Sequence, residues 1–109
     1  MSRKHHDLVA WKEALSLVTD VYRATSGFPR EEAYGLTGQM RRAAVSVPAN
    51  IAEGAARNTD KEFLQFLHIA RGSLSELETH TLIARNLGYL MPNEELSSKI
   101  RRSLGSSAA

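Results

Sequence analysis

The sequence contains no cysteine, and only 6% of its residues are aromatic. Without cysteine, the chain cannot form disulfide bonds, thiolate nucleophiles or cysteine-rich zinc sites. No apolar run approaches the roughly 20 residues that a membrane-spanning helix needs, and the N-terminal segment lacks the apolar core of a signal peptide. These absences predict a cytoplasmic protein that does not enter a membrane.

Length and composition predict one globular domain. The chain has 109 residues, of which 42% are hydrophobic and 24% charged. This length suffices for one compact core but not for two, and the composition is that of ordinary folded proteins. We therefore expect a single domain over residues 1–109.

Apolar residues recur at three- and four-residue steps in four segments, and no segment alternates with a period of two. Asp7 is the expected N-cap of the first helix, Pro29 opens the second, and Thr59 with Glu62 forms a capping box at the third. Short turns between helices favour antiparallel neighbours. The predicted fold class is therefore all-α, an antiparallel up-down-up-down four-helix bundle. Its helices are expected at about residues 7–25, 30–54, 59–87 and 93–104.

The helical spacing also predicts which residues form the core. On the first helix the expected apolar stripe is Leu8, Trp11, Leu15, Val18 and Tyr22. On the second helix the apolar residues fall within about 100° of arc. These residues are Leu36, Met40, Ala43, Ala44, Val47 and Ile51.

The third predicted helix carries more apolar residues than one contact surface needs. Outside its main stripe it has Ile69, Ile83 and Leu87 on one flank, and Leu64 and Leu82 on the other. Two explanations stay open. Either this helix is central and touched by two neighbours, or the protein associates with further copies of itself through the excess apolar surface.

The stretch SVPANIAEG places Pro48 inside the second helix. Because proline has no N–H and its ring crowds the preceding turn, we expect a bend there. Asn50 can satisfy polar groups around the bend, and Glu53 can pair with Arg57 four residues later. We interpret Pro48, Asn50, Glu53 and Gly54 as a structural signature rather than a ligand site.

No catalytic, cofactor or metal site emerges from the sequence. Glu76 and His80 lie four residues apart, but no other helix offers a matching pair, so a pair along one solvated helix is preferred to a metal site. The glycines of residues 34–38 do not follow a strand, which argues against a phosphate-binding loop. The prediction is a non-enzymatic protein without cofactor or metal. Catalysis by Asn50, Glu53 and His80 is a distant alternative.

Arginine clusters are the candidate contacts to nucleic acid. Arg41, Arg42 and Arg57 are the cations that we select, because arginine suits phosphate geometry. The formal net charge is only +2, so an ordinary solvated surface is the competing explanation. A ring of identical subunits would repeat the same arginines and produce a denser positive field.

Several blocks of the sequence, taken in order, resemble a known family. The chain is similar to the four-helix-bundle proteins encoded by intervening sequences within bacterial 23S ribosomal RNA genes, over about residues 7–91. The blocks are Trp11 to Ala14, Phe28-Pro29, Gly35-Leu36, Gln39 to Ala44, Asn50 to Gly54, and Ala70 to Ser73 followed by Glu76.

This resemblance implies a small antiparallel helical bundle without enzymatic activity, assembled as a ring-shaped homopentamer. The family also includes the accessory protein of diversity-generating retroelements, which binds nucleic acid and a reverse transcriptase through a basic surface. The expected function is therefore that of a nucleic-acid-associated accessory protein, with RNA or DNA and a reverse transcriptase as expected partners. The alternative is a protein–protein interaction module, a scaffold without a nucleic-acid role.

Overall fold

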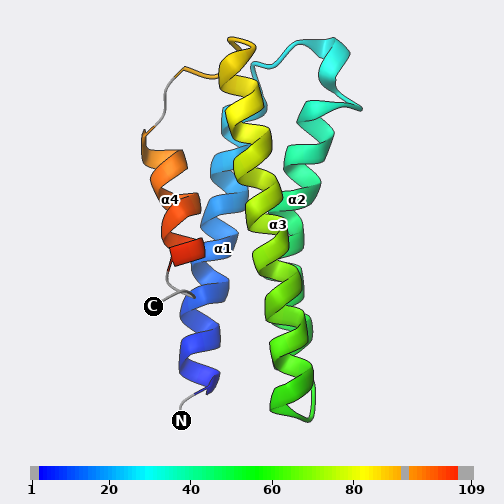
Figure 1. The fold of residues 1–109 in the computed structure, drawn as a ribbon, viewed down its shortest axis with the longest axis vertical. Helices are drawn as coiled ribbons and strands as arrows, with labels where there is room; N and C mark the ends of the chain where they lie inside the picture. The colour runs from blue at the N-terminus through cyan, green and yellow to red at the C-terminus, as the bar shows by residue number, and fades with distance from the viewer. Residues whose placement is uncertain (1–2, 92–93, 106–109) are drawn as a thin grey trace.

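The computed structural model describes residues 3–91 and 94–105, and within them the chain is helical, with no strand. Figure 1 shows the helices lying side by side, with α4 the shortest. The expectation of an all-α fold with four α-helices is confirmed. The elements are α1 (Arg3–Thr25), the one-turn 3-10 helix η1 (Arg30–Glu32), α2 (Leu36–Ala55), α3 (Asp60–Asn86) and α4 (Glu94–Gly105).

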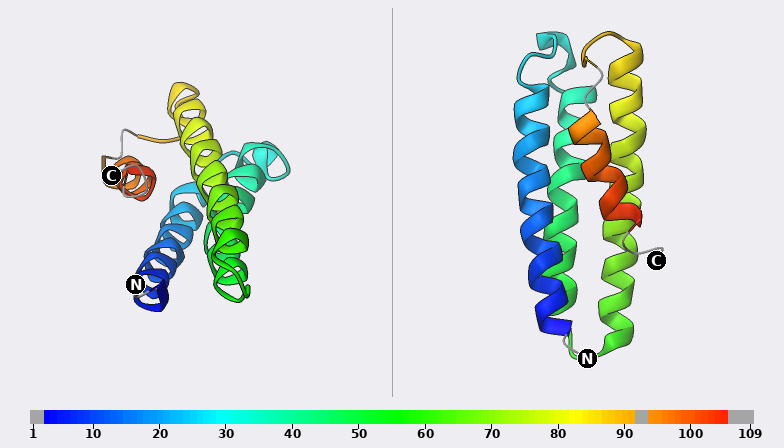
Figure 2. Two further views of the ribbon diagram at one scale, coloured as in Figure 1. Left: turned by 60° about the horizontal axis from the view of Figure 1, so that its bottom comes forward. Right: turned by 90° about the vertical axis from the view of Figure 1, so that its left-hand side faces the viewer.

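Each helix contacts two others, so that α1, α2, α3 and α4 surround one core in that order. The turn between α2 and α3 lies near the start of α1, and the α1–α2 and α3–α4 connections lie at the opposite end (Figure 1). Figure 2 shows that α4 lies against only part of the length of α1 and α3. The largest fully buried side chains are Leu17, Val21, Met40, Leu77 and Ile100.

The first helix, α1, begins earlier than the sequence predicted. The side of this helix that is buried also differs from the predicted side. Since α1 already begins at Arg3, Asp7 lies inside it, and the predicted N-cap at Asp7 is wrong. No glycine or proline between these positions interrupts the helix. All five residues of the predicted apolar stripe are only partly buried or exposed, whereas a neighbouring stripe is buried. The buried residues are Ala14, Leu17, Val21 and Thr25.

The second predicted helix, residues 30–54, is in fact two elements. Pro29 precedes only the single turn of η1, and α2 begins at Leu36. The break follows from Gly35, whose backbone has φ −104° and ψ −116°. The Glu32 carboxylate accepts a hydrogen bond from the Leu36 N–H at 3.1 Å. A Cβ atom at Gly35 would lie 2.8 Å from Glu32 Oε1, so a larger residue would displace this carboxylate from its capping position.

The third and fourth helices match their predictions closely. Thr59 is the N-cap of α3, and its hydroxyl oxygen accepts the Glu62 N–H at 3.1 Å. The chain leaves α3 through Gly88, whose φ of +79° favours glycine. On α4, Leu96 and Ile100 are buried. The predicted start at residue 93 lies outside the described residues.

Glu32 also links the α1–α2 connection to the segment that follows α3, at the same end of the bundle. The Tyr89 hydroxyl donates to Glu32 Oε2 at 3.0 Å, and the Tyr89 ring lies 5.5 Å from the Phe28 ring, measured between centroids. The hydrogen bond to the Glu32 carboxylate is the main cause that raises the pKa of Tyr89 above its ordinary value. One carboxylate therefore caps α2 and holds the segment that follows α3.

None of the helices in the described ranges is both long and apolar enough to cross a membrane.

Candidate nucleic-acid interface

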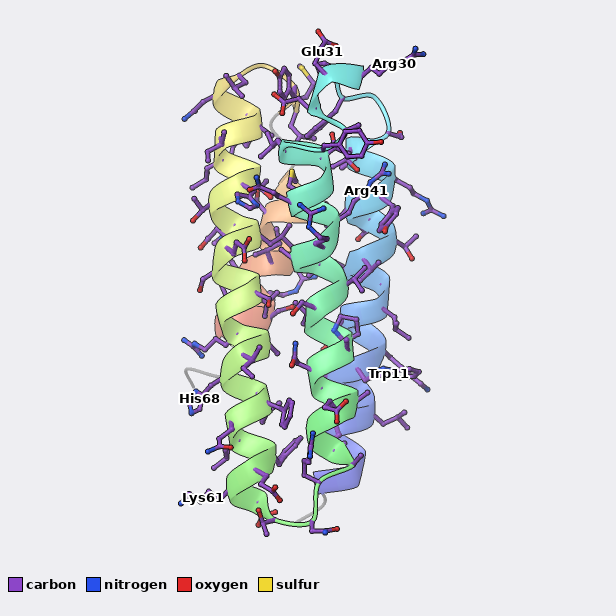
Figure 3. All side chains as sticks on the ribbon, turned by 90° about the vertical axis from the view of Figure 1, so that its right-hand side faces the viewer. Trp11, Arg30, Glu31, Arg41, Lys61 and His68 are labelled. Carbon is purple, nitrogen blue, oxygen red and sulfur yellow. The ribbon has the colours of Figure 1, made fainter. Side chains whose placement is uncertain are left out.

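Arg41 connects two helices of the bundle. Its Nε donates to the Thr25 hydroxyl at 2.9 Å, and its Nη2 donates to the Tyr22 carbonyl at 3.3 Å. The guanidinium carbon also lies 4.5 Å from the centroid of the Tyr22 ring. In Figure 3 the Arg41 side chain lies between α2 and α1. Binding a phosphate through Arg41 would compete with these contacts.

Arg57 makes an ion pair and a contact with an aromatic ring close to the turn between α2 and α3. Its Nη2 lies 2.7 Å from Glu53 Oε2, which confirms the predicted pair. The guanidinium also lies 4.7 Å from the centroid of the Phe66 ring. Both charged side chains are substantially exposed, so the ion pair itself contributes at most about 1 kcal/mol. Arg57 thus connects the end of α2 to α3 mainly by packing on an aromatic ring.

Arg42 is the most available of the three predicted arginines. It is exposed, and within the described residues it makes no hydrogen bond or ion pair. Its guanidinium lies along the helix over Gly38, where a Cβ atom would be 3.0 Å from Arg42 Nη1. A phosphate could reach this group without breaking a contact of the fold.

Replacing Arg41 and Arg42 separately tests this difference. We expect Arg41→Ala to lower the free energy of unfolding by about 1 to 3 kcal/mol, because charged hydrogen bonds between α1 and α2 are lost. Arg42→Ala is the matched control and should change it by less than about 0.5 kcal/mol. Urea unfolding followed by circular dichroism measures both. If Arg41→Ala and Arg42→Ala lowered the free energy of unfolding equally, the conclusion that only Arg41 makes contacts that stabilise the fold would be contradicted.

The segment around Pro48 makes internal polar contacts. Asn50 Nδ2 donates to the Ser46 carbonyl at 2.8 Å and to the Ser46 hydroxyl at 2.9 Å. The Ser73 hydroxyl lies 2.8 Å from that of Ser46 and so connects α3 to α2. The helix continues through Pro48, which is itself buried. As predicted, Asn50 satisfies polar groups next to the proline.

Gly54 permits a close approach between α2 and α3. A Cβ atom at this position would lie 2.8 Å from Phe66 Cβ and 3.0 Å from Phe63 Cδ1. Any larger residue would push the two helices apart near their shared turn. The geometry therefore gives Gly54, like Asn50 and Glu53, contacts within the bundle.

The acidic and histidine side chains form no common site in the described part of the chain. No three histidine, aspartate or glutamate residues there are grouped so that they could hold a metal ion. His80 Nε2 lies 4.0 Å from Glu76 Oε2, the pair expected along one helix. No hydrogen bond or ion pair described for residues 3–91 and 94–105 joins Asn50, Glu53 and His80.

The excess apolar residues of α3 remain uncovered. All five predicted flank residues are exposed, from 42% at Ile83 to 55% at Leu87. As one of the two explanations expected, α3 is touched by two neighbours, α2 and α4, but these leave the five side chains about half exposed. Further exposed apolar residues, which the sequence did not single out as surface, lie on α1 and α2. These are Leu8, Val9, Leu15, Tyr22 and Val45.

The chain matches the model of a known protein family. The family model described as 23S rRNA-intervening sequence protein matches residues 6–106. A search of the curated proteins found no match. The family match covers all four helices except the first three residues of α1.

Proposed function

Because the chain belongs to the 23S rRNA-intervening sequence protein family, we propose that it is a non-enzymatic accessory protein that assembles into a homopentameric ring and associates with nucleic acid. The subunit of this ring is an antiparallel up-down-up-down bundle. The observation that carries the proposal is the apolar surface of α3 and α1 that remains exposed. Burying such surface contributes about 25 cal/mol per Å², which favours association of copies.

The distribution of charge supports the nucleic-acid part of the proposal. Lys12 and Arg23 on α1 and Arg42 on α2 are all exposed. Assembly would repeat these cations around the ring, so that a chain of small net charge presents a concentrated positive field. Contacts of this kind bind RNA or DNA through phosphates, with little sequence preference.

Electrophoretic mobility shift with structured RNA and duplex DNA tests the proposal. The wild-type protein is expected to bind, with an affinity that falls steeply as salt rises. Arg42→Glu should weaken binding about tenfold or more at low salt, because each subunit loses one cation and gains an anion. Lys61→Glu, the same charge change at an exposed position close to the α2–α3 turn, is the control and should retain binding (Figure 3).

Light scattering shows whether the ring forms. It also shows whether both charge variants keep the oligomeric state of the wild type, which the comparison of nucleic-acid binding requires. The wild type and both charge variants are expected to show the mass of five subunits. If Arg42→Glu keeps that mass and binds nucleic acid as tightly as wild type, Arg42 is not a contact. A monomeric wild type would contradict the ring and remove the concentration of charge that binding requires.

A second candidate function is a protein-interaction scaffold without a nucleic-acid role, in which a reverse transcriptase or another protein is the direct ligand. It is supported by the contacts of Arg41 and Arg57 within the fold, which leave fewer free cations for phosphates. Pull-down with nuclease treatment distinguishes the two functions. A protein partner that stays bound after nuclease supports the scaffold, whereas release supports bridging by nucleic acid.

A further inference from the structure

Tyr34 lies on the connection between η1 and α2 and is 95% exposed, more than any other large apolar or aromatic side chain of the described residues. Within residues 3–91 and 94–105 its side chain makes no hydrogen bond, ion pair or ring contact. The other exposed tyrosine, Tyr22, differs because it carries the Arg41 guanidinium on its ring. Tyr34 therefore presents both faces of its ring to solvent.

The backbone that carries Tyr34 is held by hydrogen bonds on both sides. The Glu32 carbonyl oxygen accepts the Gly35 N–H at 3.0 Å, across Tyr34. The Glu32 carboxylate accepts the Leu36 N–H at 3.1 Å and the Tyr89 hydroxyl at 3.0 Å. A group that is held in place before it meets a ligand loses less conformational entropy on binding. The ring is thus displayed from a fixed turn at the end of the bundle.

The exposed charges of this turn are of both signs. Arg30 and Glu31 lie at the end of the bundle and point away from it in Figure 3. In the described part of the chain the Arg30 side chain makes no hydrogen bond or ion pair, so it is available to a phosphate. A double helix presents mainly phosphates to a protein, and Glu31 repels these while Arg30 attracts them. Attraction of phosphates alone therefore gives little binding at this turn.

An unpaired nucleobase suits the chemistry of this turn better than a duplex does. Its flat face can stack on an exposed aromatic ring, and such stacking accepts every base because each has a π-face. In a double helix the bases are stacked on one another and do not reach a side chain in this way. A protein partner would favour a ring at the centre of a wider apolar patch, whereas residues 30–32 of this turn are all charged.

We propose that Tyr34 stacks on an unpaired base of single-stranded nucleic acid and that Arg30 contacts the adjoining phosphate. The inference rests on the proposed association with nucleic acid and names the segments that this end of the bundle binds. A contact of Arg42 with phosphates does not distinguish paired from unpaired strands. The Tyr34 contact forms only with unpaired bases, so loops and single-stranded ends are the preferred ligands.

Fluorescence anisotropy tests this contact with labelled oligoadenylate RNA, as a single strand and as its duplex with oligouridylate. Tyr34→Ala should weaken binding of the single strand about fivefold or more, because one stacked ring per subunit is lost, and should leave duplex binding unchanged. Tyr34→Phe keeps the ring and should bind both RNAs as the wild type does. Arg42→Glu should weaken the binding of both RNAs, because both carry phosphates.

Met91→Ala is the matched control for Tyr34→Ala. Met91 is 80% exposed and lies two residues after Tyr89, whose hydroxyl contacts Glu32, so it belongs to the same end of the bundle. Because Met91 has no aromatic ring, Met91→Ala should bind the single strand as tightly as the wild type. Circular dichroism and light scattering should show wild-type helicity and mass for all variants at positions 34 and 91, because both side chains lie in solvent.

The outcomes separate the stacking contact from nucleic-acid binding itself. If Tyr34→Ala binds the single strand as tightly as wild type, or loses duplex binding equally, Tyr34 does not stack on a base, and phosphate binding through Arg42 stands. Equal losses for Tyr34→Ala and Met91→Ala would show that this end binds by apolar area, and equal losses for Tyr34→Ala and Tyr34→Phe that it binds by the hydroxyl. Either result overturns the contact. A wild type that binds neither RNA contradicts the proposed function as well.

Discussion

Replacing Gly54 with alanine is expected to destabilise the protein by about 1 to 3 kcal/mol, the usual effect of overpacking a well-packed contact. The added Cβ would lie 2.8 Å from Phe66 Cβ and 3.2 Å from the Phe63 carbonyl oxygen. Neither neighbour is the free end of a flexible side chain, so α2 and α3 must separate. Guanidinium unfolding at one fixed protein concentration, followed by circular dichroism, measures the loss.

Gly72 provides the matched control for this prediction. It also lies within a helix, but nothing is found within 4 Å of where its Cβ would be. Alanine at an open helical position should stabilise the protein by about 0.5 to 1 kcal/mol, because glycine is the poorer helix former. The two alanine variants should therefore change stability in opposite directions. A gain for Gly54→Ala would mean that the close approach of the two helices is not required.

Local chemistry made some elements predictable from the sequence. The cap at Thr59 depends on residues three apart, and the pair of Glu53 and Arg57 on residues four apart. Such contacts follow from helix geometry as soon as the helix is recognised. The break at Gly35 was missed, although the glycine was visible. It depends on how the Glu32 carboxylate folds back to cap α2.

The face of α1 that enters the core was not predictable from periodicity. This helix has one apolar stripe through Leu8, Leu15 and Tyr22 and a second through Leu17 and Val21. Both stripes have helical spacing, and only packing against the other helices shows that the second is buried. An apolar pattern identifies a helix and its possible contact faces, but it does not say which of two faces meets its own chain.

The candidate interface was predictable only in part for a similar reason. The sequence identified Arg41 and Arg42 as neighbours of the same type. Whether each is free depends on contacts across the fold, such as that between Arg41 and Thr25, which lie 16 residues apart. Consecutive residues on a helix point about 100° apart, so one reaches α1 while the other faces solvent.

Two leucines of α3 give the largest expected contrast in stability. Leu77 is fully buried, whereas Leu82 is 50% exposed. We expect Leu77→Ala to cost about 2 to 5 kcal/mol, because it removes buried methyl groups and leaves a cavity. Leu82→Ala should cost less than about 1 kcal/mol, because its side chain is already half in water.

Chemical unfolding of both variants over a range of protein concentrations tests this contrast. At a low protein concentration the cost of Leu82→Ala should stay small, because the rest of the bundle leaves this side chain half exposed. A cost of several kcal/mol that grows with concentration would show that another copy covers this flank of α3. The loss at Leu77 should not grow with concentration, because Leu77 is fully buried within the single bundle.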